Sequence, residues 1–257
     1  MFLTVGIPTY EMHPYGAEFV DFSLDILSRQ SFKDFEVLVS DHSKDDSIQN
    51  AVSRWKGILN INYLKKEYKI DNPSSNLNNI FQNARGEYIK IIFQDDFLFD
   101  NQSLEKTVEK IKSTDFPAWL VSPSEHSEDG HTMIRPFYPH YNNDIHIGNN
   151  TISSPSVLAI KNDANKVYFN ENFKWLMDCI YYKDCFTKFG NPVIIDDITV
   201  VNRWWGNQLT NQLGDKARND EVIMAIKLYD SPSRLISYKL GNLYKKLRKK
   251  IKNAITS

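Results

Sequence analysis

The stretch YIKIIFQDDF, Tyr88 to Phe97, is an apolar run that ends abruptly in Gln94, Asp95 and Asp96. Its length and composition predict a buried strand followed by an acidic turn. Two adjacent carboxylates at the end of a buried segment are costly to desolvate unless a cation lies close to them. The stretch therefore predicts an acidic strand end that meets a positively charged group.

Strand and helix patterns alternate through the first hundred residues. The predicted strands cover residues 2–8, 35–41, 61–67 and 88–94, and the predicted helices cover residues 17–30, 45–55 and 75–84. Consecutive strands that are separated by helices pair in parallel through right-handed crossovers. These residues therefore predict an α/β fold with a Rossmann-like, mostly parallel central sheet flanked by helices.

The pattern becomes less regular after Asp96. A helix is predicted over residues 103–113 and another over 172–190. Strands are predicted near residues 118–123 and 156–162, with one or two more within 192–205. Residues 122–153 read as a long polar loop or a small subdomain, and loops of this length in compact domains are often functional. Without a low-complexity linker, we expect one domain over 1–230, with halves 1–100 and 101–230, followed by a tail at 231–257.

Charge is distributed unevenly along the chain. The formal net charge is -1, but residues 231–257 contain eight Lys or Arg and no acid, so residues 1–230 are acidic. An acidic body argues against binding of nucleic acid. The two cysteines are too few for a structural zinc site. No apolar stretch approaches a membrane span, and no basic leader precedes the first apolar run, so we expect a cytoplasmic protein.

The predicted strands end in polar loops that can share one crevice. These loops are Pro8–Tyr10, Ser40–Ser43 and Gln94–Asp96, and the carboxyl ends of parallel strands are where such folds bind ligands. Neither of the standard glycine-rich phosphate loops is present. A divalent cation, Mn²⁺ or Mg²⁺, held by carboxylates would bind phosphate oxygens instead. The alternative is that the acids cap a helix or lie solvated in a turn.

Three motifs at matching spacing resemble the inverting family 2 glycosyltransferases. They are VGIPTY (5–10), VLVSDHSKDDS (37–47) and NLNNIFQNARGEYIKIIFQDDF (76–97). The resemblance covers roughly residues 2–210 and implies a GT-A fold that binds a nucleotide sugar. It implies that Asp41 contacts the base, and that the donor site also includes Pro8, Thr9, Tyr10, Asn76 and Asp95.

The acidic motif departs from the pattern of this family, which has an acid, any residue and a second acid. This chain has Gln94, Asp95 and Asp96 at these positions. In an extended strand, Gln94 and Asp96 point to the same side and Asp95 to the other. The resemblance then implies Asp96 as the main metal ligand, with Gln94 as a weaker, neutral substitute for the first acid.

The second half resembles the acceptor side of the same family. The segment FNENFKWLMDCIYY (169–182) resembles the one that places an acid beside the acceptor, which implies Asp178 as the general base. The alternative is a solvent-facing helix residue. RWWGNQLT (203–210) resembles a stretch that closes over the donor diphosphate, which implies that Arg203 contacts phosphate. The spacing of His126, His131, His140 and His146 does not match a zinc site and favours acceptor recognition or a surface loop.

The tail predicts a basic amphipathic helix. Ile236, Leu240, Leu243, Leu247 and Ile251 share one stripe, with lysines around it. Such a helix lies on an anionic membrane surface, here through residues 235–255 on the inner face, or packs on the domain or a second subunit.

Together these patterns predict a metal-dependent inverting glycosyltransferase. We expect it to use a UDP-sugar to extend a glycan or lipid-linked acceptor in cell-surface polysaccharide synthesis. The alternatives are a nucleotidyltransferase of similar α/β fold and a non-catalytic protein that binds sugar nucleotides.

Overall fold

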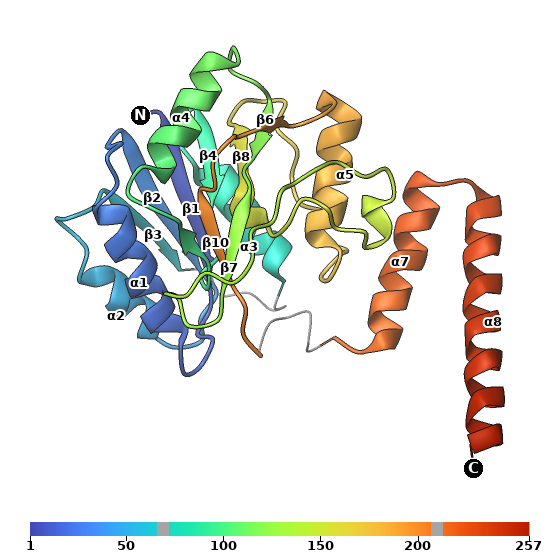
Figure 1. Ribbon diagram of the computed structural model, residues 1–257. Coiled ribbons are helices and arrows are strands. Elements are labelled where there is room, and N and C mark those ends of the chain that lie inside the picture. Colours follow the sequence, from blue (N-terminus) through green and yellow to red (C-terminus); the bar gives the residue numbers. More distant parts are fainter. Residues whose placement is uncertain (66–71, 207–212, 257) are drawn as a thin grey trace.

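The computed structural model describes residues 1–65, 72–206 and 213–256. Across these residues the chain forms a seven-stranded sheet and a separate three-stranded sheet (Figure 1). In spatial order the large sheet contains β3 (Ile61–Lys65), β2 (Phe35–Asp41), β1 (Leu3–Thr9), β4 (Tyr88–Ile91), β8 (Leu158–Lys161), β6 (Trp119–Val121) and β9 (Val193–Ile194). The small sheet contains β5 (Phe97–Leu98), β10 (Val200–Arg203) and β7 (Ser124–Ser127).

Helices cover both faces of the large sheet. The described helices are α1 (Gly16–Ser28), α2 (Ser47–Ser53), α3 (Pro73–Asn83), α4 (Ser103–Ser113), α5 (Met177–Phe189), α7 (Asp215–Tyr229) and α8 (Pro232–Thr256), with short 3-10 turns η1 (Ile145–Ile147) and η2 (Pro155–Val157). Apolar residues of α1, α2 and α4 share one buried cluster, and those of α3, α5 and α7 share the other. The helix stripes therefore bury against opposite faces of one sheet.

The pairing confirms the predicted α/β architecture. Strands β1, β2, β3 and β4 run parallel, whereas β8 pairs antiparallel with β4 and β6. The register pairs Thr9 with Asp41, which places the ends of β1 and β2 side by side. Part of the predicted third strand, residues 66 and 67, lies outside the described residues. The helix predicted over 172–190 begins later, at Met177, and the sequence patterns did not indicate α7, β5 or β7.

The acidic motif lies in a turn and not in a strand. Strand β4 ends at Ile91, and the N–H of Asp96 donates to the carbonyl of Phe93 at 3.0 Å. This bond closes a turn over residues 93–96. The expectation that Gln94 and Asp96 point to one side of an extended strand and Asp95 to the other is therefore wrong, because the chain has already left the sheet at these positions.

Gly86 allows the chain to enter β4 close to β1. A Cβ atom at this position would lie 2.4 Å from the backbone nitrogen of Thr4 and 2.5 Å from the carbonyl carbon of Leu3. Both contacts are backbone atoms, which do not move aside as a flexible side chain can. Gly86 is thus required for close packing at the start of the strand.

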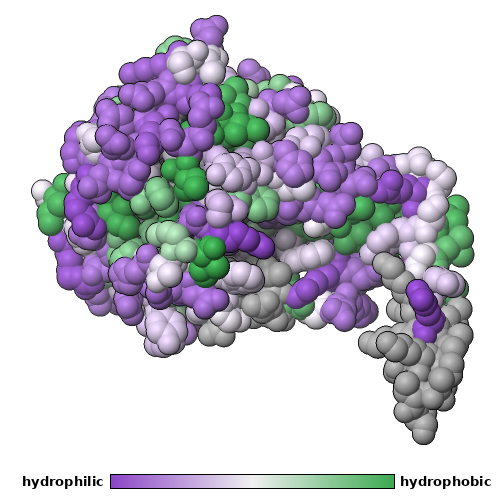
Figure 2. Space-filling view, viewed as in Figure 1, coloured by the Kyte–Doolittle hydropathy of each residue, from purple (hydrophilic) through white to green (hydrophobic). Residues whose placement is uncertain are grey.

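Helix α8 extends from the edge of the body beside α7, whose Val222, Ala225 and Ile226 are part of the core (Figure 1). Helix α8 contacts α7 through hydrogen bonds from Tyr238 and Asn242 to the Asn219 side chain, at 3.1 and 2.9 Å. Ile236, Leu240 and Leu243 are 60, 61 and 55% exposed. Figure 2 shows α7 and the first part of α8 beside a largely hydrophilic body surface. Among the described helices, none combines the length and apolar character that a membrane crossing requires.

Candidate functional site

A pocket of about 460 Å³ lies where the loops after β1 and β4 meet the small sheet and the segment before η2. The predicted site residues that line it are Pro8, Tyr10, Asn76, Gln94, Asp95, Asp96 and Arg203. Thr9, Asp41 and Asp178 are not among its lining residues. The fold therefore brings most of the predicted residues to one cavity, although several of them have contacts other than those expected.

Gln94 joins the acidic turn to the loop after β1. Its Oε1 accepts the N–H of Tyr10 at 3.0 Å, and its Nε2 donates to the carbonyls of Tyr10 and Gly16, both at 2.9 Å. The side chain is only 2% exposed. Gln94 thus connects the acidic turn to the loop after β1 by hydrogen bonds, whereas the sequence predicted that it binds a metal ion.

The two carboxylates of the turn are buried in different surroundings. Asp96 accepts hydrogen bonds from Ser154 and Ser156 on Oδ2, at 3.0 and 2.6 Å, and from the backbone N–H of Arg203 on Oδ1, at 3.0 Å. Asp95 Oδ2 accepts one from Trp205 Nε1 at 2.8 Å. Burial raises the pKa of both carboxyls, and the charge of Asp95 raises the pKa of Asp96 further. A cation beside this pair would relieve the cost of its ionisation.

Lys90 is one such cation, and it lies on β4, the strand that precedes the acidic turn. Its side chain is 1% exposed, and its Nζ donates to the carbonyl of Ser156, whose hydroxyl bonds to Asp96. Burial lowers the pKa of Lys90 to about 7, while the charge of Asp96 acts in the opposite direction. The sequence shows a single lysine within an otherwise apolar run, but no role was predicted for it.

Arg203 does not point its charge freely into the pocket. Its guanidinium lies over three phenylalanine rings, with ring-centroid distances of 4.6, 5.5 and 5.3 Å to Phe19, Phe22 and Phe97. Its Nε donates to the carbonyl of Asp95 at 3.1 Å. Burial lowers the pKa of this side chain, and the acids nearby oppose the shift. Arg203 therefore contacts the acidic turn through the carbonyl of Asp95, whereas the sequence predicted that it contacts the donor diphosphate.

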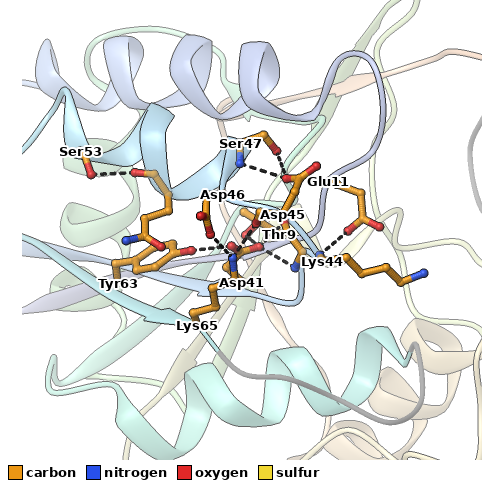
Figure 3. A network of polar contacts seen from close by, with 12 residues as sticks. Thr9, Glu11, Asp41, Lys44, Asp45, Asp46, Ser47, Ser53, Tyr63 and Lys65 are labelled. Carbon is orange, nitrogen blue, oxygen red and sulfur yellow. Dashed lines mark hydrogen bonds and ion pairs between the residues drawn. The ribbon is translucent and has the colours of Figure 1, made fainter.

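Asp41 is the centre of a polar network at the ends of β1, β2 and β3 (Figure 3). Thr9 Oγ1 and the N–H of Ser43 donate to its Oδ1 at 3.2 and 2.9 Å, and the Tyr63 hydroxyl donates to its Oδ2 at 2.5 Å. Asp41 and Thr9 are fully buried. Asp41 therefore shapes the loop that carries His42 to the pocket, whereas the sequence predicted direct contact between Asp41 and the base.

Asn76, a predicted donor-site residue, lies near the start of α3. It lines the pocket, and its Nδ2 donates to the carbonyl of Thr9 at 3.0 Å. Its Oδ1 is buried without a hydrogen-bond partner among the described residues. Helix α3 begins at Pro73 because Asn72 accepts the N–H of Ser74 as a side-chain cap. The helix start thus sets Asn76 beside the loop that carries Tyr10.

Asp178 lies in the first turn of α5 and is linked to the pocket through Asn150 and Ser153. Its Oδ1 accepts the N–H of Cys179 and its Oδ2 accepts Asn150 Nδ2, both at 2.7 Å. Burial raises the pKa of this carboxyl to about 6. Both carboxylate oxygens therefore have partners within the protein, and the residue is partly exposed. Asn150 also donates to the carbonyl of Ser153, which lines the pocket.

The pocket also includes residues outside the predicted site. They are His126, Arg135, Ser153, Ser154 and Asn202. They come from the long polar segment and from β10, and the sequence pattern does not show which residues meet there. His146 instead lies buried against Asp230 at 2.8 Å, so the histidines do not gather. Among the described residues, no group of three or more His, Cys, Asp or Glu could hold a metal ion.

Comparison with known proteins identifies the fold. The TarS crystal structure from S. aureus matches with a TM-score of 0.66 at 20% identity, over 89% of this chain and 39% of TarS. The TarS 1–349 complex with UDP-GlcNAc matches with 0.67 at 18% identity, over 90% and 68% of the two chains. The mannosyltransferase PcManGT from Pyrobaculum calidifontis, in complex with GDP-Man and Mn²⁺, matches with 0.56 at 16% identity, over 96% and 82%. This chain spans well under half of the full TarS chain.

The comparisons with sequences give a single positive result. No curated protein matches this chain. The model of the family described as Glycosyl transferase family 2 matches residues 4–186, which is more than half of the chain. The parallel sheet, the pocket at its strand ends and this match agree: the protein belongs to glycosyl transferase family 2 and has the GT-A fold.

Proposed function

We propose that the protein transfers a sugar from a UDP-sugar to a glycan or lipid-linked acceptor, with inversion at the anomeric carbon, in the synthesis of cell-surface polysaccharide. The supporting observation is one pocket that joins a donor side, with Tyr10 and Asn76, to an acceptor side, with Ser153 and Asn202, across the Asp95–Asp96 turn. The TarS 1–349 structure with UDP-GlcNAc and the PcManGT structure with GDP-Man support a nucleotide-sugar donor.

In this proposal Asp178 is the general base. The acceptor hydroxyl loses its proton to the Asp178 carboxylate as its oxygen bonds to the anomeric carbon. The bond from that carbon to the diphosphate oxygen breaks, and the nucleoside diphosphate leaves with the electron pair. A carboxyl with a pKa near 6 is ionised at neutral pH and still accepts a proton readily.

The acidic turn fits a divalent cation that also binds the donor. A carboxylate oxygen has about two acceptor positions. Asp96 Oδ1 and Asp95 Oδ2 each accept one hydrogen bond in the structure, so each has capacity left. An ion held by one or two carboxylates takes its other ligands from phosphate oxygens and water, so a larger protein cage is unnecessary. Mn²⁺ or Mg²⁺ would here neutralise charge on the leaving diphosphate.

Thermal unfolding with ligands tests the donor proposal. UDP with Mn²⁺ is expected to raise the melting temperature by several degrees, since a ligand at 100 times its Kd adds about 2.7 kcal/mol. UDP alone should give a smaller shift. Arms with GDP and with UTP, each with Mn²⁺, are the comparison. A larger shift with the triphosphate would contradict the proposal and indicate a nucleotidyltransferase, and no shift with any nucleotide would contradict donor binding.

Helix α8 is proposed to bring the enzyme to the inner face of an anionic membrane. The exposed stripe of Ile236, Leu240 and Leu243 and the excess of basic residues in the tail support this role.

Deleting residues 235–257 should abolish binding to anionic vesicles while donor hydrolysis in solution is retained. Each Lys or Arg near such a surface contributes about 1 kcal/mol, so high salt should weaken the binding of the parent. Flotation with anionic and with neutral vesicles measures the effect. Vesicle binding that survives the deletion contradicts the assignment, and a change from dimer to monomer would indicate a subunit contact instead.

A further inference from the structure

Ser153 has an unusual backbone conformation on the pocket wall. Its φ angle is +98°, in a region that side-chain-bearing residues seldom adopt. Such conformations persist only where surrounding contacts over-determine them, and they cluster at functional sites. The structure supplies these contacts from several sides. Tyr182 Oη donates to the Ser153 carbonyl at 3.2 Å, and Asn202 Nδ2 donates to the Ser153 hydroxyl oxygen at 2.7 Å.

Asn150 makes the largest set of these contacts. Its Oδ1 accepts the N–H groups of Ile152 and Ser153, both at 3.0 Å. Its Nδ2 donates to the carbonyl of Ser153 at 3.1 Å and to Asp178 Oδ2 at 2.7 Å. Both acceptor positions and both donor hydrogens of the amide are therefore used. A carboxylate at this position has no hydrogen to donate, and a shorter side chain does not span the same distance.

We propose that Asn150 is a positioning residue, which fixes the Asp178 carboxylate against the pocket wall at Ser153 and stabilises its ionised form. This inference rests on the proposed role of Asp178 as the base. The bond from a neutral amide to the carboxylate favours the charged form, which is the form that accepts a proton. The same side chain ties the orientation of Asp178 to the segment that borders the acceptor.

The other titratable groups near Asp178 do not compete with this contact. Cys179 and Tyr182, both on α5, have pKa values raised well above their ordinary range by burial and by the charge of Asp178. Both are therefore neutral at neutral pH. Asp96 is connected to Ser153 indirectly, through hydrogen bonds that run by way of Ser154 and Asn202. The Asp178 carboxylate has direct contacts with two side chains, the neutral Cys179 thiol on its own helix and Asn150, and Asn150 is the one that connects it to the pocket wall at Ser153.

Asn150→Asp and a matched control, Asn149→Asp, test the inference. Asn149 is exposed, so its variant adds the same charge one residue away. A carboxylate against Asp178 should raise the pKa of the base, and we expect the midpoint of the kcat profile to move upward by about one pH unit or more. The KM for the donor should stay unchanged. The control should keep the profile of the parent. A profile that does not move, or that moves equally in both variants, overturns the inference.

A double-mutant cycle keeps the inference testable if Asn150→Asp folds poorly. Asn150→Ala should slow transfer by about tenfold in the parent and should have no further effect on transfer in an Asp178→Asn background. An equal loss in both backgrounds would mean that Asn150 acts on structure and not through Asp178, and it would overturn the inference. Full activity of Asp178→Asn alone is a different failure, because it contradicts the base itself.

Discussion

Asp178→Asn is expected to slow sugar transfer by roughly 10²–10⁴-fold, the usual scale for the loss of a general base. Asparagine has nearly the same shape and still accepts the N–H of Cys179, but it cannot take the proton of the acceptor hydroxyl. Donor binding should be preserved, because in this proposal the Asp178 carboxylate, which is held by Cys179 and Asn150, meets the acceptor and not the nucleotide. Transfer rate and UDP affinity are the two measurements.

The pH dependence of the parent gives an independent check on Asp178. Burial raises the pKa of this carboxyl to about 6, and only the ionised form is a base. The transfer rate of the parent should therefore fall as the pH is lowered through 6. The residual rate of Asp178→Asn should lack this step. A step near pH 6 that survives in the variant would show that another group titrates in the reaction.

Stability distinguishes loss of the base from misfolding. A carboxyl whose pKa is higher in the folded than in the unfolded protein destabilises the fold as it ionises, here between about pH 4 and 6. Asparagine does not ionise. The variant avoids this cost but loses the hydrogen bond from Asn150 Nδ2, so its melting temperature at pH 7 should stay close to that of the parent. A large loss of stability together with loss of UDP binding would indicate a folding defect, and retained transfer would contradict the base.

The predicted architecture followed from periodic signals that are local in the sequence. Apolar runs and helical stripes over the first hundred residues predicted the parallel strands, because each pattern reflects burial of its own segment. The sequence predicted β8 as a strand but not its antiparallel direction, and it did not indicate the helix α7. β8 is short and runs antiparallel between β4 and β6, and α7 carries a mixture of charged and apolar residues over Asp215–Tyr229.

The contacts of the site were harder to predict than its members. The motifs selected Asp41, Gln94 and Arg203, and the fold does bring them to the pocket or to its edge. Their hydrogen bonds depend on residues far away in the sequence, such as Tyr63 for Asp41 and Tyr10 for Gln94. A single sequence does not reveal these partners. Lys90 is the opposite case. The sequence shows one lysine within an apolar run, but no motif predicts its role.

Asp96→Asn is expected to remove most of the Mn²⁺-dependent part of UDP binding. The change removes one negative charge from the acidic turn, where burial already makes ionisation costly. It also leaves the buried ammonium of Lys90 without the carboxylate charge that favours it. Asparagine keeps only one of the two oxygens that accept hydrogen bonds from Ser154, Ser156 and Arg203, so the variant should lose some stability without ligand, whereas UDP alone should still bind through the side of the pocket that contains Tyr10 and Asn76.

The measurement is the shift in melting temperature between UDP alone and UDP with Mn²⁺, for the parent, Asp96→Asn and Asp95→Asn. Each tenfold gain in affinity that the ion gives the parent corresponds to about 1.4 kcal/mol, and Asp96→Asn should lose most of it. The exposed Asp197 provides a control, since Asp197→Asn removes the same charge away from the pocket. Asp96 already has hydrogen bonds on both carboxylate oxygens, whereas Asp95 has one from Trp205. If Asp96→Asn kept the full effect of Mn²⁺ and Asp95→Asn lost it, the metal would belong to Asp95, and Asp96 would serve only to hold Ser154, Ser156 and Arg203 in place.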